Sequence, residues 1–240
     1  MLEILFAGIA PGLALLSYFY LKDKYEPEPV SMVFFTFFSG ALLIIPIAFL
    51  DYVLKAENVV KYDSIYAIFS SGLIEEFFKW SILFVIAYRS VEFDEPFDGI
   101  VYGTSVSLGF ATVENIMYLM TNGMEFALTR ALLPVSSHAL FGVIMGYYIS
   151  KAKFTKESRW PLSLLSLLLP ALLHGIFNFL LLNQGSWLSM SPYMVFLWWF
   201  GLKKVQLAEI SSYNHFQKNY IIKPGSNLKS GMKILLPMSR

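Results

Sequence analysis

Apolar runs long enough to cross a lipid bilayer constrain this chain more than any other feature of its sequence. About 20 consecutive apolar residues cross the hydrocarbon layer as a helix. Of the 240 residues, 56% are hydrophobic and 15% are charged, whereas soluble domains carry about 25% charged residues. The sequence therefore predicts an all-α fold, a polytopic transmembrane helix bundle of about seven spans. The predicted spans are residues 4–21, 30–50, 64–88, 99–121, 131–150, 161–183 and 193–208.

Lysine and arginine are distributed unequally between the two sets of short loops. The loops after the first, third and fifth spans hold seven of them, against three in the loops after the second, fourth and sixth. Because cytoplasmic loops are enriched in these residues, the bias predicts an N-terminus outside and a C-terminus in the cytoplasm. Residues 1–208 are then a single integral-membrane domain, and residues 209–240 a flexible, Lys-rich cytoplasmic tail.

Net charge and cysteine content exclude several function classes. A net charge of +1 gives no nucleic-acid signature, so we expect no nucleic-acid partner. The absence of cysteine excludes disulfides and thiol catalysis. Membrane lipids are the partner that the composition itself predicts.

Ionisable side chains inside the predicted spans are few, and they indicate where a functional site lies. Such groups are rare at this depth and usually face a bundle interior or a watery cavity. Buried amides in the same spans also need hydrogen-bond partners. The ionisable residues are Glu75, Glu76, Lys79, Glu114, His138 and His174, and the amides are Asn115 and Asn178.

The glutamates and histidines of this set are predicted to share one layer of the membrane. Counted from the outer end of each span at about 1.5 Å per residue, they lie roughly 10–18 Å below the outer surface. Four predicted spans contribute to the layer. A single polar site in the outer half of the membrane explains this more simply than chance does.

Spacing within the third span suggests how its charges are arranged. Glu75 and Lys79 are four residues apart, share a helix face and can form an ion pair. Glu76 is turned about 100° away from Glu75. We expect Glu76 to lack such a partner and to point into a cavity.

The fifth and sixth spans read alike around their histidines. His138 and His174 each follow a proline by four residues, and His174 shares a helix face with Asn178. A proline removes a helix hydrogen bond and can open a kink. We expect Pro134 and Pro170 to make room for water or substrate.

A glutamate, one or two histidines and an asparagine suffice for amide hydrolysis. A glutamate can take a proton from water, an imidazole can orient that water, and an amide N–H can stabilise the oxyanion. Glu76 is the better candidate for the base, although spacing alone does not decide between Glu75 and Glu76. Purely structural roles stay open: an ion pair for Glu75 and Lys79, and packing or cross-helix bonding for other members of the set.

The order of these motifs resembles a known family. The segment G-L-I-E-E-F-F-K, with Glu75, Glu76 and Lys79, resembles the E-E-x-x-K motif of the PrsW intramembrane proteases. E-P-F-D-G-I-V-Y-G at 95–103 and F-A-T-V-E-N at 110–115 resemble that family's next two signatures. H-A-L-F-G and H-G-I-F-N, which begin at His138 and His174, resemble the last two. The resemblance covers roughly residues 1–210.

The resemblance implies a glutamic-type endopeptidase embedded in the bacterial cell membrane, related to the CAAX prenyl endopeptidases and the Abi immunity proteins. It also implies a substrate, a single-pass transmembrane anti-sigma factor. The protease would make the first cut on the extracytoplasmic side, which starts the release of a sigma factor in a stress response. The implied catalytic residues are Glu75, Glu76, Glu114, His138 and His174, and the implied orienting or oxyanion residues are Lys79, Asn115 and Asn178.

This chain departs from its CAAX relatives in two motifs. Their first motif is E-E-x-x-x-R, whereas here the basic residue is Lys79, one position earlier. Their second motif is F-x-x-x-H, and Glu114 stands where that histidine would be. Whether Glu114 or His138 fills this role stays open. The third motif, H-x-x-x-N, is matched by His174 and Asn178.

The same residues also allow three other interpretations. Two histidines and a carboxylate also make a catalytic zinc set. However, H-E-x-x-H is absent, so we expect no cofactor and keep zinc as the alternative. A proton- or ion-coupled transporter would also place acids and histidines near the midplane. A non-catalytic membrane sensor or immunity-type protein would tolerate the loss of Glu76.

Overall fold

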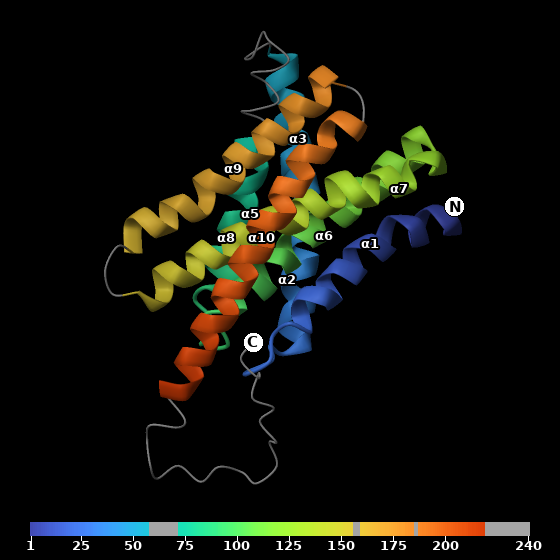
Figure 1. The fold of residues 1–240 in the computed structure, drawn as a ribbon. Coiled ribbons are helices and arrows are strands. Elements are labelled where there is room, and N and C mark those ends of the chain that lie inside the picture. The colour runs from blue at the N-terminus through green and yellow to red at the C-terminus, as the bar shows by residue number, and fades with distance from the viewer. Residues whose placement is uncertain (58–71, 156–158, 185–186, 219–240) are drawn as a thin grey trace.

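The computed structural model describes residues 1–57, 72–155, 159–184 and 187–218, and over these ranges the chain is helical with no β-strand (Figure 1). The predicted all-α bundle is therefore confirmed. Its elements, in chain order, are α1 (Leu2–Tyr20), α2 (Val30–Leu42), α3 (Ile44–Ala56), α5 (Glu76–Ile82), η2 (Leu83–Ala87), α6 (Asp98–Asn122), η3 (Met124–Phe126), α7 (Ala127–Arg130), η4 (Ala131–Val135), α8 (Ser136–Phe154), α9 (Arg159–Gln184) and α10 (Trp187–Phe216).

Four of the helical segments are long and apolar enough to cross a membrane: Leu2–Tyr20, Val30–Ala56, Met124–Phe154 and Arg159–Leu182. They correspond to the predicted first, second, fifth and sixth spans. The first part of the predicted third span, residues 64–71, lies outside the described residues.

Helix α10 is longer than the predicted seventh span, 193–208, because polar residues at its ends lower its hydropathy without interrupting the helix. The last part of the predicted tail, residues 219–240, lies outside the described residues.

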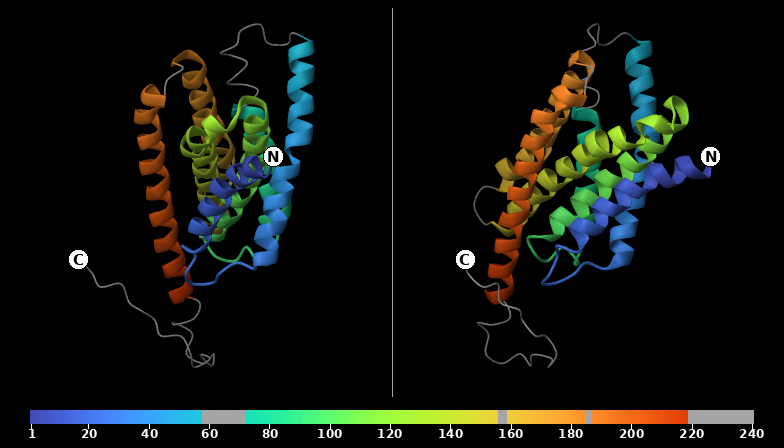
Figure 2. Two further views of the ribbon diagram at one scale, coloured as in Figure 1. Left: turned by 90° about the vertical axis from the view of Figure 1, so that its right-hand side faces the viewer. Right: turned by 45° about the vertical axis from the view of Figure 1, so that its right-hand side comes forward.

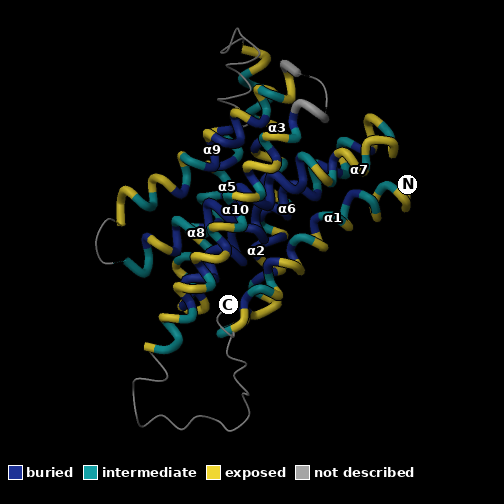
Figure 3. Tube along the Cα trace, in the orientation of Figure 1, coloured by how far each residue is buried: buried dark blue, intermediate teal, exposed yellow. Residues whose placement is uncertain are grey.

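Helix α6 lies at the centre of the bundle. It packs against α1, α2 and α8, and every residue from Asp98 to Thr112 is buried. In Figure 3 the buried part of the trace runs through α6 and α8, and exposed positions lie toward the periphery. Neighbouring helices cover α6, so it tolerates polar side chains such as Ser105, which is hydrogen-bonded to Thr36 at 3.0 Å. The first residue of this helix and its second half each contribute to one of the two carboxylate clusters described below.

Small residues allow α6 and α8 to approach until their backbones touch. Gly99 and Gly103 on α6 face Gly142 and Gly146 on α8, each pair spaced by four residues. A Cβ atom at Gly146 would lie 1.9 Å from the carbonyl oxygen of Gly99, and one at Gly103 would lie 2.5 Å from that of Gly142. This is the small-xxx-small contact of membrane helices. It holds two of the site-bearing helices together.

The two prolines that precede the histidines lie in different local structures. Pro134 lies in the π-helical turn Ala131–Val135, directly before the α8 segment that carries His138. Such wide turns arise where the regular hydrogen-bond ladder is interrupted, and they are frequent at functional sites. Pro170 lies inside α9, which runs as one helix from Arg159 to Gln184.

The outer helices form opposite sides of the bundle. Figure 2 shows α10 on one side and α2 with α3 on the other, with α6 and α8 between them. The loop between α1 and α2 and the loop before α6 lie at the same end of the molecule, the lower end in that view. From the lysine and arginine count, we expect this end to face the cytoplasm.

Candidate active site

Lys79 is the centre of a buried polar cluster that draws on α5, α6, α8 and α9. Its ammonium nitrogen lies 2.8 Å from Glu76 Oε1, 3.3 Å from Glu75 Oε2 and 3.1 Å from His138 Nδ1. The lysine side chain is fully buried, and its nitrogen also lies over the ring of Phe110, 4.4 Å from the ring centre. The predicted Glu75–Lys79 ion pair is thus present, and it is part of a larger network.

Glu76 is placed differently from its prediction. It does not lie unpartnered in a cavity: it is fully buried, pairs with Lys79 and accepts a hydrogen bond from His174 Nδ1 at 3.0 Å. The expectation was wrong because residues three apart on a helix are neighbours as much as residues four apart are. Lys79 therefore reaches both glutamates.

His174 joins the two glutamates from α9. Its Nδ1 faces Glu76, and its Nε2 lies 3.9 Å from Glu75 Oε2. Its ring stacks on Phe141, with ring centres 4.9 Å apart and planes inclined by 24°, and meets His138 edge-on at 5.0 Å. With Nδ1–H donated to Glu76, Nε2 of the neutral ring is free to accept a hydrogen bond on the Glu75 side.

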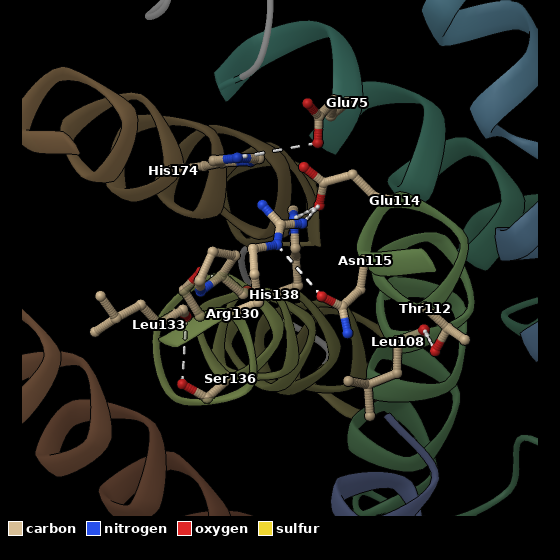
Figure 4. A network of polar contacts seen from close by, with 12 residues as sticks. Glu75, Leu108, Thr112, Glu114, Asn115, Arg130, Leu133, Ser136, His138 and His174 are labelled. Carbon is tan, nitrogen blue, oxygen red and sulfur yellow. Dashed lines mark hydrogen bonds and ion pairs between the residues drawn. The ribbon is translucent and has the colours of Figure 1, made fainter. Parts of the chain in front are cut away.

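His138 connects Lys79 to Glu114. An ammonium group can only donate, so His138 Nδ1 accepts from Lys79, and the neutral ring carries its proton on Nε2. That nitrogen lies 3.2 Å from Glu114 Oε2, which accepts the hydrogen bond (Figure 4). Glu114 and His138 are therefore partners in one chain of contacts, which is why spacing alone could not assign one role to either.

Arg130 completes this chain of contacts and was not among the predicted site residues. Its Nη2 lies 3.2 Å from Glu114 Oε2, and its Nε donates to Asn115 Oδ1 at 3.3 Å (Figure 4). Asn115 in turn donates to the carbonyl oxygen of Gly8 at 3.1 Å. A usable signal existed, since Arg130 is the only lysine or arginine between Arg89 and Lys151.

The two asparagines among the predicted site residues make different contacts. Asn115 holds α1 and Arg130 rather than facing the two glutamates. Asn178 is half-buried on α9, one turn after His174. Among the described residues its side chain makes no hydrogen bond that would occupy it.

The charges of the cluster nearly balance. Glu75, Glu76 and Glu114 face two cations, Lys79 and Arg130. The cluster thus holds one carboxyl group more than it holds lysine and arginine side chains. A carboxylate in excess of the cations is suited to accept one proton, which is what a general base does.

Glu75 and Glu76 differ in the exposed fraction of their side chains. The side chain of Glu76 is 0% exposed, whereas that of Glu75 is 14% exposed. Glu76 is held on both sides by Lys79 and His174. Glu75 is thus the more accessible of the two glutamates.

The residues present also fit a metal ion. Glu75, His138 and His174 can each offer one ligand atom, and these atoms all lie within 4.8 Å of one another. Two imidazoles and one carboxylate form the protein ligand set of many catalytic zinc sites. Glu76, which accepts the hydrogen bond from His174 Nδ1, would orient His174 as a ligand without binding the metal itself.

Comparisons with known proteins identify the family to which the chain belongs. Residues 28–202 match the family described as PrsW family intramembrane metalloprotease. Relatives named Protease PrsW include one from Bacillus subtilis (strain 168), 55% identical over 87% of this chain and 96% of the relative. Another, from Clostridioides difficile (strain 630), is 34% identical over 90% of this chain and 94% of the relative. No solved structure matches the chain. The chain is therefore a member of the PrsW family of intramembrane proteases, a peptidase of the bacterial membrane.

Proposed function

We propose that this peptidase makes the first, extracytoplasmic cut in a single-pass transmembrane anti-sigma factor, using Glu75 to activate water. The observation that carries the proposal is the Lys79-centred cluster, in which one glutamate is locked and the other is accessible. The motif resemblance supports the substrate class. The predicted depth of the cluster, in the outer half of the bacterial plasma membrane, supports the side of the cut.

Glu75 replaces Glu76 as the proposed base for a geometric reason. A base must meet the water it deprotonates, and the Glu75 side chain is the more exposed. His174 Nε2 and Glu75 Oε2 are 3.9 Å apart, so one water molecule beside both can form hydrogen bonds of about 2.8 Å to each. Glu76 keeps the His174 ring in the orientation that this water requires.

The hydrolysis then proceeds with its protons balanced. Glu75 takes a proton from water while the water oxygen forms a bond to the scissile carbonyl carbon. The carbonyl oxygen becomes an oxyanion, which we assign the side-chain amide of Asn178, one turn after His174 on α9, to stabilise; such a donor contributes roughly 2.7–4 kcal/mol. Glu75 returns the proton to the amide nitrogen, the C–N bond breaks, and a carboxylic acid and an amine leave.

Lys79 and the Arg130 chain are positioning groups in this proposal. Lys79 pairs with both Glu75 and Glu76 and fixes their separation. Glu114, paired with Arg130, holds His138 in the tautomer that accepts from Lys79. Glu114 and His138 thus share the role that the histidine of the F-x-x-x-H motif has in the CAAX relatives. His138 contacts Lys79 through Nδ1 and Glu114 through Nε2.

We propose the metal-independent, glutamic-type reaction because Lys79 already provides a cation to Glu75, Glu76 and His138. The family description names a metalloprotease, and Glu75, His138 and His174 would be the residues that hold the metal. When bound, a metal supplies Lewis-acid polarisation of the carbonyl and a more acidic water. The two chemistries respond differently to chelation.

The test is cleavage of a tagged single-pass anti-sigma factor by the purified protein in proteoliposomes. The proposal expects one cut on the extracytoplasmic side of the substrate span, unaffected by a strong chelator that is removed before assay. Loss of cleavage on chelation, with recovery on adding Zn²⁺, would replace the glutamic mechanism by a zinc mechanism. Absence of cleavage, together with proton-coupled solute uptake by the same vesicles, would overturn the peptidase assignment in favour of a transporter.

A further inference from the structure

A second carboxylate cluster lies at the end of the bundle where the α1–α2 loop meets the start of α6. Asp23 and Glu28 come from that loop, Glu95 from the loop after η2, and Asp98 is the first residue of α6. Figure 2 shows both loops together at the lower end of the molecule. We refer to these four residues as the loop cluster.

The loop cluster is buried, although it consists of acids. Asp23 is 6% exposed, Glu28 3%, Glu95 1% and Asp98 0%. Both carboxylate oxygens of Glu95, Oδ1 of Asp98 and Oε1 of Glu28 lack a hydrogen-bond donor in the described part of the chain. Buried polar groups without partners are uncommon, and each needs an explanation such as an ion or a proton.

The basic residues near the loop cluster are engaged elsewhere. Lys22 and Lys24 lie 3.7 and 3.8 Å from Glu209. Lys153 donates to the carbonyl oxygen of Tyr88 at 2.8 Å and lies over the ring of Phe93. Over the described residues, no ion pair joins a lysine or arginine to any of the four acids. The negative charge of the cluster is therefore not balanced from within this part of the chain.

The arrangement of oxygens fits a hard cation. Asp23, Glu95 and Asp98 can each offer one oxygen, and these oxygens all lie within 4.8 Å of one another. Oxygens bound at about 2.3–2.6 Å around Ca²⁺ have this mutual spacing. Two ligands are also held in place: Asp98 Oδ2 accepts from the Glu95 backbone N–H at 2.6 Å, and the Tyr102 hydroxyl donates to Glu28 Oε2.

Burying these acids has an electrostatic cost that a bound cation would offset. Four carboxylates are buried without an ion pair to a described lysine or arginine, and a buried charge is costly unless it is paired or coordinates a metal.

We propose that the loop cluster binds one divalent hard cation, of the Mg²⁺, Ca²⁺ or Mn²⁺ class, through Asp23, Glu95 and Asp98 with Glu28 completing the oxygen shell. Bound there, the cation ties the α1–α2 loop to the N-terminus of α6. It is separate from the Lys79-centred cluster, whose imidazole and carboxylate donors suit a softer metal such as zinc.

The test uses the full-length protein in detergent, stripped of metal, with Mn²⁺ as the probe in an electron paramagnetic resonance titration. The proposal expects one bound Mn²⁺ per chain, displaced by Ca²⁺ or Mg²⁺, and a melting temperature that rises with each cation. Glu95→Gln and Asp98→Asn should weaken binding by at least about tenfold. Asp94→Asn is the matched control, since Asp94 adjoins Glu95 but is exposed, and it should bind as wild type does.

The contrary outcomes are equally specific. Mn²⁺ binding that survives in Glu95→Gln but is lost in His174→Gln would place the cation in the Lys79-centred cluster and overturn the proposal. No binding by wild-type protein, with a melting temperature that responds to acidification alone, would show that protons neutralise the acids. The Glu95→Gln protein should fold without added cation, because the substitution removes a buried charge, so its loss of binding can be read directly.

Discussion

The bundle contains two buried clusters of carboxylates, and they are neutralised in opposite ways. In the Lys79-centred cluster, Lys79 and Arg130 reach three glutamates at 2.8–3.3 Å. In the loop cluster, four acids are buried without an ion pair to any described lysine or arginine. The first cluster carries its own counter-charges on rigid helices, whereas the second depends on something bound from outside.

This difference indicates what each cluster does. A site whose charges are fixed in advance can act on a reacting group without reorganising, which is what catalysis requires. A site whose charges are uncompensated responds to a ligand, because binding removes the cost of burying them. Carboxylates thus serve chemistry beside the second half of α6 and stabilise the contact between loops and helix at its start.

The largest effect is expected for Lys79→Met. It leaves Glu75 and Glu76 buried without their shared cation, and removing one partner of a buried ion pair costs about 3–5 kcal/mol. We expect the free energy of unfolding in detergent to fall by this amount and cleavage to be lost. Adding Glu76→Gln to Lys79→Met should restore part of the stability but not the activity. A Lys79→Met protein of wild-type stability would contradict the account of an internally balanced cluster.

Gly146→Val is expected to act on both clusters at once. Its side chain would enter the space of the Gly99 carbonyl, where even a Cβ would lie at 1.9 Å. Overpacking of this kind costs about 1–3 kcal/mol. Both the cleavage rate and Mn²⁺ affinity should fall, because α6 carries Asp98 as its first residue and Glu114 in its second half. An effect on one readout alone would show that the clusters are not joined through the α6–α8 contact.

A smaller effect is expected for Arg130→Gln. Glu114 is 36% exposed on its side chain, so solvent screens the pair and its loss should cost about 1 kcal/mol or less. Cleavage should slow because His138 is no longer held, while the reaction retains its base. Thr129→Ser, a change at the exposed neighbouring position, is the control. If Arg130→Gln abolishes cleavage as completely as loss of Glu75, Arg130 acts at the reacting atoms rather than through Glu114.

The smallest effect, and one of opposite sign, is expected for Glu95→Gln. In the presence of a chelator, this substitution removes one buried, uncompensated charge, so the free energy of unfolding should be unchanged or higher by about 1 kcal/mol. Thermal unfolding of wild type and variant, each with and without Ca²⁺, checks this. Wild type should gain stability from Ca²⁺, and the variant should not. A clear loss of stability in the chelated variant would mean that Glu95 is already balanced by the protein.

The contrast between the clusters also shows what the sequence could reveal. Most members of the Lys79-centred cluster were predictable, since charges and imidazoles inside apolar runs are conspicuous. Its internal pairing was not, because the helical spacing of Glu76 allowed both a cavity and a contact with Lys79. Arg130 was missed because it was assigned to a loop, whereas the structure places it at the end of α7, directly before a π-helical turn.

The loop cluster could not have been found by spacing. Asp23 and Glu95 lie far apart in the chain and in predicted loops, where acids are ordinary. Only the packing of α1 and α2 around the start of α6 brings them together and buries them. Tertiary contacts, rather than local pattern, create this site.

The measurement that tests the central claim most directly compares Glu75→Gln with Glu125→Gln in the proteoliposome cleavage assay. Glu125 is an exposed glutamate in η3 and is the matched control. The account predicts that Glu75→Gln melts close to wild type but cleaves at least about 10²–10⁴-fold more slowly, while Glu125→Gln cleaves normally. A folded Glu75→Gln protein that cleaves at the wild-type rate would show that Glu75 is not the base.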